Sequence, residues 1–420
     1  MAKRQLGGVR LALGLIACLA VATPCAAQQV AFTLGGGAGS GLIDLATGVT
    51  TTLTDDAAQV GSLLTADGVF AVRVVSPGTL QLRHMPSGSQ STIAADFEPR
   101  VAHPRQHVIF GQSAGQPARL DARGLARWDR CLVSSTGTLP MDLSIDGSTL
   151  FVLCGGDVIG VDTGTGQETR RLAAAGLAVG FAVNAAATEA VGWRNTGVPA
   201  ELVRIDLTSG QVLATRPLAD PFSYGVLIAA TPRRDRIVAN TCRVLTVNIS
   251  CTPVLVDATT LADVRVLPSG SSFATGPTTT VSPDGRDAFV SGDALAFVDT
   301  FATWIDVESG AVRAQVFRSA LDGGIGIAYR PRPLPPVLAP AQVAANMVGL
   351  AWRLEAASPM ATRYVVEAGA APGATMVTLG AAGTALGVPG APPGRYYVRV
   401  RAVNRHGTSA PSNEIVVDVP

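Results

Sequence analysis

The chain has 420 residues, 47% of them hydrophobic, which is enough for two or three domains with large buried cores. Its 46 glycines and 27 prolines favour many turns and short strands over long helices. The net charge of +1 gives no electrostatic case for nucleic-acid binding, and with Lys3 as the only lysine, a lysine Schiff base and a P-loop lysine are excluded from the mature chain.

The N-terminus has the pattern of a secretory signal peptide. Three basic residues among the first ten precede an apolar run over 11–22, and Cys25-Ala26-Ala27 offers small residues before a cut ahead of Gln28. The run is shorter than the roughly 20 residues that a membrane span needs, and no later stretch of sequence qualifies. We therefore expect residues 1–27 to be a cleaved signal peptide, and the mature protein to be secreted or periplasmic without a membrane span.

Two alternatives stay open at this end of the chain. The segment could instead be an uncleaved anchor. In addition, Leu15-Ile16-Ala17-Cys18 resembles a lipobox, which predicts a lipoprotein anchored at Cys18, although the apolar run continues beyond that cysteine to Ala22.

A repeated unit runs through residues 28–333. Each copy has an apolar residue, then Asp in most copies, then a short polar turn that often ends in Gly, as in Ile205-Asp206 to Gly210. Seven copies recur at intervals of 38 to 51 residues, which is the range of propeller blades. The key residues are Asp44, Arg83, Asp121, Asp162, Asp206, Asp257 and Asp306.

A second turn signal lies upstream in the units. Asp-Gly follows an apolar stretch and precedes another at Asp67-Gly68, Asp146-Gly147 and Asp284-Gly285, and Pro232-Arg233-Arg234 occupies the same place in one unit. Asp-Gly favours tight turns because glycine accepts positive φ. Each unit therefore reads as four short antiparallel strands. Because such a sheet cannot bury both faces alone, the units predict a seven-bladed β-propeller.

The two ends of the repeat are complementary. Residues 323–332 have the pattern of a first strand, whereas the N-terminal stretch from Val30 to Asp55 has the later strands of a unit and no first one. We therefore expect the two ends to complete one blade together and so to lock the ring.

The units resemble the YVTN-type bacterial β-propeller repeat. Ser282-Pro283-Asp284-Gly285, Ile237-Val238-Ala239-Asn240 and the segment from Ile305-Asp306 to Gly310 match its turn, its YVAN-like strand and its VID-x-x-TG segment. This repeat scaffolds enzymes and binders alike, so the resemblance implies a fold and no particular function.

Four cysteines remain after the predicted cleavage, and an even number in an exported protein indicates disulfides. Cys242 and Cys251 flank a segment that we expect to turn back on itself, which favours that pair and leaves Cys131 with Cys154. No close Cys-x-x-Cys spacing supports a zinc site instead.

The repeat stops at a proline-dense linker over 331–340, which we expect to be extended and stiff. Beyond it, Val348, Leu350 and Trp352 alternate with other residues, as in a half-buried strand. Short alternating strands over 334–420 predict a β-sandwich.

This tail resembles a fibronectin type III domain. The match lies in Tyr396 to Asn404, followed by Gly407 and Ser409, which resembles the penultimate strand of that family. The resemblance implies that Trp352 is the early core tryptophan and that Tyr396 forms a tyrosine corner. It also implies a spacer or adhesion module.

Several motifs resemble chemical sites but have simpler interpretations. Gly111-Gln112-Ser113-Ala114-Gly115 fits a nucleophile elbow, yet no helix follows it. His103 and His107 are four apart, but Pro104 places them on either side of a strand turn. The glycine-rich segment from Gly35 to Gly41 lacks the helix that a phosphate site needs. The repeated aspartates should each accept hydrogen bonds from turn N–H groups in separate blades.

We therefore assign no catalytic residue, cofactor or metal from the sequence. Phe297, Phe301 and Trp304 fall where one unit is widened, and they are candidates for a binding loop. The first hypothesis is an exported, non-catalytic binding protein for an unknown protein or carbohydrate, of undetermined oligomeric state. The alternatives are a propeller enzyme, such as a lactonase or other hydrolase with its site at the ring axis, and a purely structural surface protein.

Overall fold

The computed structural model describes residues 29–420 except 34–39, 45–49, 55–61, 66–69, 77, 85–88, 122, 132–138, 174, 196–198, 245–248, 269–277, 282–286, 295–298, 320–325, 330–331, 345–346, 356–357, 359–360 and 405–406. The predicted signal peptide with Cys18 and most of the Gly35–Gly41 segment lie outside these described residues. Every regular element within them is a β-strand, so the predicted all-β class is confirmed. None of these residues forms a helix of the length and apolar character that a bilayer crossing requires.

Seven four-stranded antiparallel sheets follow one another in the described stretch of the chain up to Tyr329. The first sheet comprises β28 (Gly326–Tyr329), β1 (Gln29–Thr33), β2 (Ser40–Asp44) and β3 (Thr50–Thr54), and the second comprises β4 (Ser62–Leu64), β5 (Phe70–Ser76), β6 (Thr79–His84) and β7 (Gln90–Ala94). The third sheet comprises β8 (Glu98–Ala102), β9 (Ile109–Ser113), β10 (Gln116–Asp121) and β11 (Gly124–Arg127). The fourth comprises β12 (Met141–Leu143), β13 (Thr149–Cys154), β14 (Asp157–Asp162) and β15 (Glu168–Leu172). The fifth sheet comprises β16 (Phe181–Val183), β17 (Glu189–Arg194), β18 (Glu201–Asp206) and β19 (Val212–Pro217). The sixth comprises β20 (Ser223–Ala230), β21 (Arg236–Val244), β22 (Ile249–Asp257) and β23 (Asp263–Val266). The seventh comprises β24 (Thr278–Val281), β25 (Asp287–Ala294), β26 (Asp299–Asp306) and β27 (Val312–Ser319).

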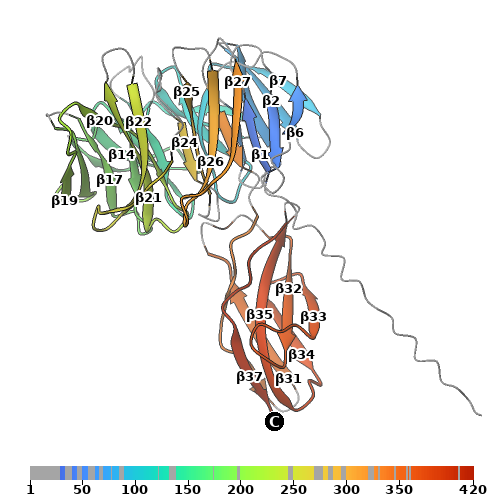
Figure 1. The fold of residues 1–420 in the computed structure, drawn as a ribbon. Coiled ribbons are helices and arrows are strands. Elements are labelled where there is room, and N and C mark those ends of the chain that lie inside the picture. The colour runs from blue at the N-terminus through green and yellow to red at the C-terminus, as the bar shows by residue number, and fades with distance from the viewer. Residues whose placement is uncertain are drawn as a thin grey trace, which may run out of the picture.

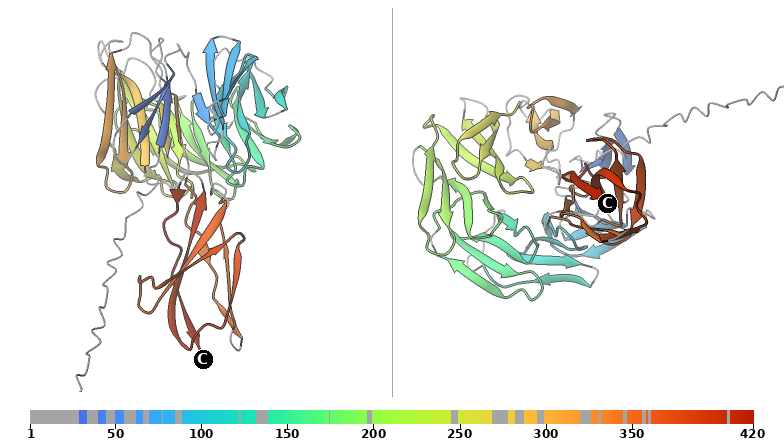
Figure 2. Two further views of the ribbon diagram at one scale, coloured as in Figure 1. Left: turned by 90° about the vertical axis from the view of Figure 1, so that its right-hand side faces the viewer. Right: turned by 90° about the horizontal axis from the view of Figure 1, so that it is seen from below.

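The sheets are arranged in an arc around a common axis, which makes this region of the fold propeller-like (Figure 2). The first strands of consecutive sheets contact one another, from β28 through β4, β8, β12, β16 and β20 to β24. We call these seven sheets the propeller region.

Apolar side chains fill the space between consecutive sheets. Phe151 and Val158 of the β12–β15 sheet, for example, share a core cluster with Phe181 and Val203 of the next sheet. Similar clusters join four other pairs of neighbouring sheets. The six sheets from β4 to β27 therefore depend on their neighbours for burial, as the repeat predicts.

The two ends of the repeat meet in one sheet. Strand β1 pairs with β28 in antiparallel register, with Val30 opposite Tyr329 and Thr33 opposite Gly326. The expected pairing of the two ends is confirmed, and β28 supplies the first strand that the N-terminal stretch lacks.

The C-terminal residues form two further sheets that share one core, and we call them the C-terminal sandwich. Val348, Leu350 and Trp352 are all buried in this core, as their alternation predicts. The strands are β29 (Val337–Leu338), β30 (Gln342–Ala344), β31 (Met347–Arg353) and β34 (Ala385–Pro389) on one side, and β32 (Arg363–Gly369), β33 (Val377–Ala381), β35 (Gly394–Asn404), β36 (Gly407–Thr408) and β37 (Ile415–Val419) on the other.

The propeller region has a rim at each end of its antiparallel strands. Turns between first and second strands, such as Ser144–Thr149 and Thr231–Arg236, share one rim with the Asp turns between third and fourth strands. The hairpin that follows Cys154 lies at the opposite end of its strands, on the other rim. The C-terminal sandwich approaches the first of these rims (Figure 1), so we call it the tail-side rim and the other the far rim.

Several turns contain a glycine whose φ lies in the left-handed region, which residues with a Cβ adopt at a cost. Replacing such a glycine by alanine tests how closely its surroundings pack against it. Gly166 has φ +72°, and a Cβ there would lie 2.3 Å from Trp128 Nε1, whereas Gly78 has φ +75° with open space around it. We expect Gly78→Ala to lower the free energy of unfolding by about 1–2 kcal/mol, from backbone strain alone. Gly166→Ala should lower it clearly further, because Trp128 must move. Urea unfolding followed by fluorescence measures both losses, and equal losses would contradict the contact.

Candidate functional site

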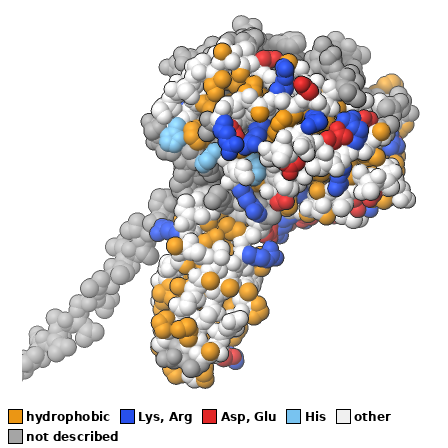
Figure 3. All heavy atoms as spheres, turned by 180° about the vertical axis from the view of Figure 1, so that it is seen from behind, with side chains coloured by type: hydrophobic (Ala, Val, Ile, Leu, Met, Phe, Trp, Pro, Cys, Tyr) orange, Lys and Arg blue, Asp and Glu red, His pale blue; other side chains and the backbone are white. Residues whose placement is uncertain are grey.

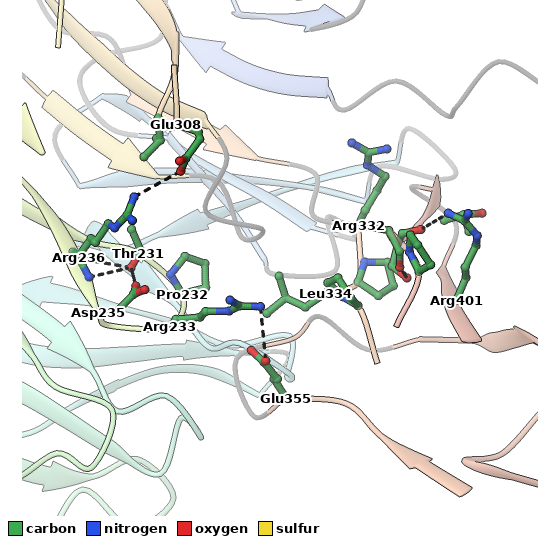
Figure 4. Close-up of a pocket in the computed structure, with 17 residues that line it drawn as sticks. Thr231, Pro232, Arg233, Asp235, Arg236, Glu308, Arg332, Leu334, Glu355 and Arg401 are labelled. Atoms are coloured by element: carbon green, nitrogen blue, oxygen red, sulfur yellow. Dashed lines mark hydrogen bonds and ion pairs between the residues drawn. The ribbon is translucent and has the colours of Figure 1, made fainter. Parts of the chain in front are cut away.

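A cavity of about 660 Å³ lies between the tail-side rim and the C-terminal sandwich. Its walls come from the Thr231–Arg236 turn, from Val307 and Glu308 after β26, from the linker at 332–335, and from Glu355 and the β35–β36 region of the sandwich. Figure 4 shows side chains from the propeller region and from the sandwich reaching into the same space. Neither makes this site alone.

Seven of the seventeen residues in the cavity wall are charged. Four arginines and three carboxylates line it, which leaves one more positive than negative charge. Arg236 Nη1 lies 3.4 Å from Glu308 Oε2. Arg233 Nη2 lies 3.9 Å from Glu355 Oε1, so this ion pair joins the propeller region to the sandwich. In the space-filling view of Figure 3, Arg side chains lie on both sides of the junction between them.

Arg234 fixes the turn that carries two of these arginines. It has φ +62°, an uncommon conformation for a residue other than glycine. Its guanidinium forms an ion pair with Asp142 and donates to the carbonyl oxygens of Leu143 and, at 3.2 Å, Val183. The Asp142 carboxylate also accepts a hydrogen bond from the backbone N–H of Val183, at 2.8 Å. Arg234 therefore ties together three consecutive sheets beside the cavity.

The linker is anchored to the sandwich where it passes the cavity. Leu334 is buried, and its backbone N–H donates to Ser358 Oγ at 2.9 Å. Arg332 lies two residues earlier and is partly buried in the cavity wall. Proline on either side of Leu334 restricts the backbone of the linker here.

The repeated aspartates do not form a shared carboxylate site. Each accepts a hydrogen bond of 2.6–2.7 Å from the backbone N–H three residues further on, within its own sheet, which confirms their predicted role. Burial opposes ionisation of Asp306, but hydrogen bonds from Ser309 and Arg313 lower its pKa to about 2. The residues concerned are Asp162, Asp206, Asp257 and Asp306.

The two histidines flank a turn between β8 and β9, as predicted. His103 is buried, and its Nδ1 accepts hydrogen bonds of 3.0 Å from the backbone N–H groups of Arg105 and Gln106. Burial, reinforced by Arg105 and Arg119, lowers the pKa of His103 to about 4. His107 is exposed and stacks edge-on against Phe70. His103 therefore has a structural role in this turn.

The predicted binding loop is only partly described. Phe297 lies outside the described residues, and Phe301 is opposite Phe317 in the β26–β27 ladder. Trp304 is a strand residue, only 4% exposed, and the guanidinium carbon of Arg313 lies 5.3 Å from its ring centroid. Trp304 is thus packed inside the sheet and is not in an exposed loop, because the β25–β26 hairpin continues straight past it.

The predicted disulfides are confirmed as Cys131–Cys154 and Cys242–Cys251. Cys154 and Cys242 lie toward the far-rim ends of β13 and β21, so both bridges are remote from the cavity. Ser113 of the elbow-like motif is followed by a two-residue turn into β10, in a plain β-hairpin. Among the described residues, no three His, Cys, Asp or Glu side chains group as metal ligands.

Sequence reasoning missed the cavity residues. Arg233 and Arg234 stand where other units have Asp-Gly, and this departure was the available signal. The sequence around Glu355 and Arg332 contained no such signal, because these residues become important only where two separate regions of the chain meet.

No protein-family model and no curated protein matches this sequence. Solved structures similar to it include hydrazine synthase of Kuenenia stuttgartiensis, at 14% identity and a TM-score of 0.45 over 59% of this chain and 76% of that one. TolB from Acinetobacter baumannii has 11% identity and a TM-score of 0.44 over 72% and 67% of the two chains. The dihydro-heme d1 dehydrogenase NirN in complex with DHE has 13% identity and a TM-score of 0.44 over 71% and 75%. These similarities are partial and assign no ligand to this chain.

Adjacent arginines in one turn allow a matched test of the Arg234 contacts. Arg234→Ala leaves Asp142 mostly buried without its cation, which should lower the free energy of unfolding by about 3 kcal/mol or more. Arg233→Ala removes a side chain that is 68% exposed and should change stability by less than about 1 kcal/mol. Urea unfolding of both variants measures the difference, and similar effects would show that Arg234 does not clamp the sheets.

The lowered pKa of His103 predicts a pH effect on stability. The folded pKa of about 4 lies below the ordinary histidine value of 6.5, so the unfolded chain binds the proton more readily between these values. The free energy of unfolding should therefore fall as the pH drops from 6.5 to 4, by up to about 3 kcal/mol from this residue. His103→Asn keeps an acceptor for the turn and should lose that share of the slope. An unchanged slope in this variant, measured by urea unfolding across the range, would contradict the assignment.

Proposed function

We propose that this chain is an exported, non-catalytic binding protein. In it, a seven-bladed propeller over 28–333 forms the binding platform, and a fibronectin type III-like sandwich over 334–420 serves as spacer or adhesion module. The observation that carries the proposal is the cavity of about 660 Å³ where the propeller region and the sandwich meet. Ligand sites commonly measure about 300–1,000 Å³ and often lie between domains.

Features of the fold support both family-level assignments. Seven four-stranded sheets, with the first completed by β28, are what a seven-bladed propeller with a two-ended closing blade requires. In the sandwich, Tyr396 Oη donates to the carbonyl oxygen of Pro392 at 3.0 Å, the hydrogen bond expected of a tyrosine corner. Trp352 packs against Tyr364 in the core, with ring centroids 5.4 Å apart.

Export is supported by the cysteines together with the N-terminal sequence. Two disulfides persist in oxidising compartments and are rare in the cytosol of most organisms. The charged start and apolar run before Gln28 supply a route to such a compartment. The mature protein is accordingly secreted or periplasmic in this proposal.

A thermal-shift series on residues 28–420 tests the binding role. The panel holds soluble glycans, lactones, divalent metal salts, quinones and short peptides. A ligand that binds only the folded protein raises Tm, increasingly so as its concentration exceeds Kd. We expect a saturable rise with one class and no hydrolysis of any lactone. Lactone turnover would replace the proposal by an enzyme, and a flat response to the whole panel would contradict small-molecule binding.

A further inference from the structure

We infer that the cavity between the propeller region and the sandwich takes a small organic oxyanion, whose carboxylate or phosphate group pairs with Arg332. The inference deepens the proposed function and rests on it, since it names the ligand class of the same site. It follows from the pairing of the cavity's charges, from the strength of those pairs and from the apolar surface beside them.

Arg332 is the one arginine of the cavity wall that has no carboxylate partner among the described residues. The other three arginines in its wall are engaged by the carboxylates of Glu308, Glu355 and Glu367. Arg332 is partly buried, yet it makes no hydrogen bond or ion pair with any residue that the structure describes. The planar guanidinium of Arg332 matches a carboxylate or phosphate in two parallel hydrogen bonds.

Two further arginines are available to help. The Arg236–Glu308 and Arg233–Glu355 pairs are long, at 3.4 and 3.9 Å, and the arginine side chains are 36% and 68% exposed. Pairs of this kind are weak in water, so either guanidinium can turn toward a bound anion at little cost. Of the three carboxylates in the wall, Asp235 accepts a hydrogen bond from Thr231 Oγ1, and Glu308 and Glu355 are the partners of these two arginines.

The cavity also offers apolar contact. The prolines Pro232, Pro335 and Pro411 present apolar surface to it, whereas Val307 and Leu334 lie behind the wall at 3% and 4% exposure. Such a surface favours a ligand with a carbon skeleton over a bare inorganic ion. Charge and size together therefore indicate an organic acid or an organic phosphate.

Three sugars with the same ring skeleton test, on the full mature chain, whether binding requires a negative charge on the ligand. Glucuronate carries a carboxylate, glucose 6-phosphate a phosphate, and glucose neither. By calorimetric titration at low salt we expect at least one of the two anions to bind about tenfold or more tightly than glucose, and added NaCl to weaken it. Comparison of the two anions shows which oxyanion the site prefers.

Variants locate the site. Arg332→Gln should weaken anion binding about tenfold or more. Arg353→Gln removes the same charge from an exposed position on β31, outside the cavity, and should leave binding unchanged. Glu355→Gln removes a negative charge from the wall and should strengthen binding a few-fold. Circular dichroism of each variant controls for folding.

The inference is overturned if glucose binds as tightly as the anions, if none of the three sugars binds, or if Arg332→Gln and Arg353→Gln behave alike. A saturable thermal shift with a neutral ligand would leave the proposed function standing while the anion assignment fails. A flat response to the whole panel and to all three sugars would remove both.

Discussion

Pairing between β1 and β28 is the constraint on which the rest of the structure depends. It joins the two ends of the repeat in one sheet, so this sheet contains strands from both ends of the propeller region. In the other sheets the first strand runs to the tail-side rim before it turns. Strand β28 occupies the same place in its sheet, so the chain leaves the propeller region at that rim. The linker and the sandwich therefore follow at the rim that carries the Thr231–Arg236 turn, and the cavity lies between them.

The repeat made much of the fold predictable. Strand patterns, the pairing of the two ends and the Cys242–Cys251 bridge are encoded locally or by period, since a hairpin brings Cys242 opposite Cys251 in direct register. Trp304 was less predictable, because a widened hairpin and an exposed loop have the same spacing in sequence. The cavity was not predictable at all. Arg233 and Glu355 belong to units with separate cores, and nothing in either sequence segment specifies the other.

One local irregularity marks the place where the propeller region and the sandwich meet. The turn after β20 lacks the Asp-Gly pair of other units and has Arg234 at a positive φ. This left-handed conformation is unfavourable for a residue with a Cβ. The buried ion pair with Asp142 and the carbonyl contacts of Leu143 and Val183 hold that conformation. Sequences generally keep local preference and tertiary structure consistent, and departures concentrate at sites under another constraint. Here the departure presents Arg233 and Arg236 to the cavity.

The direct connection across the cavity is weak by itself. Arg233–Glu355 is an exposed pair at 3.9 Å, and such pairs contribute about 0–1 kcal/mol. Interfaces between domains within one chain generally permit relative motion unless they are large and apolar. A ligand that contacts the Thr231–Arg236 turn, Arg332 and the sandwich together binds one relative orientation better than others. Such a ligand would stabilise that orientation by its differential affinity for it.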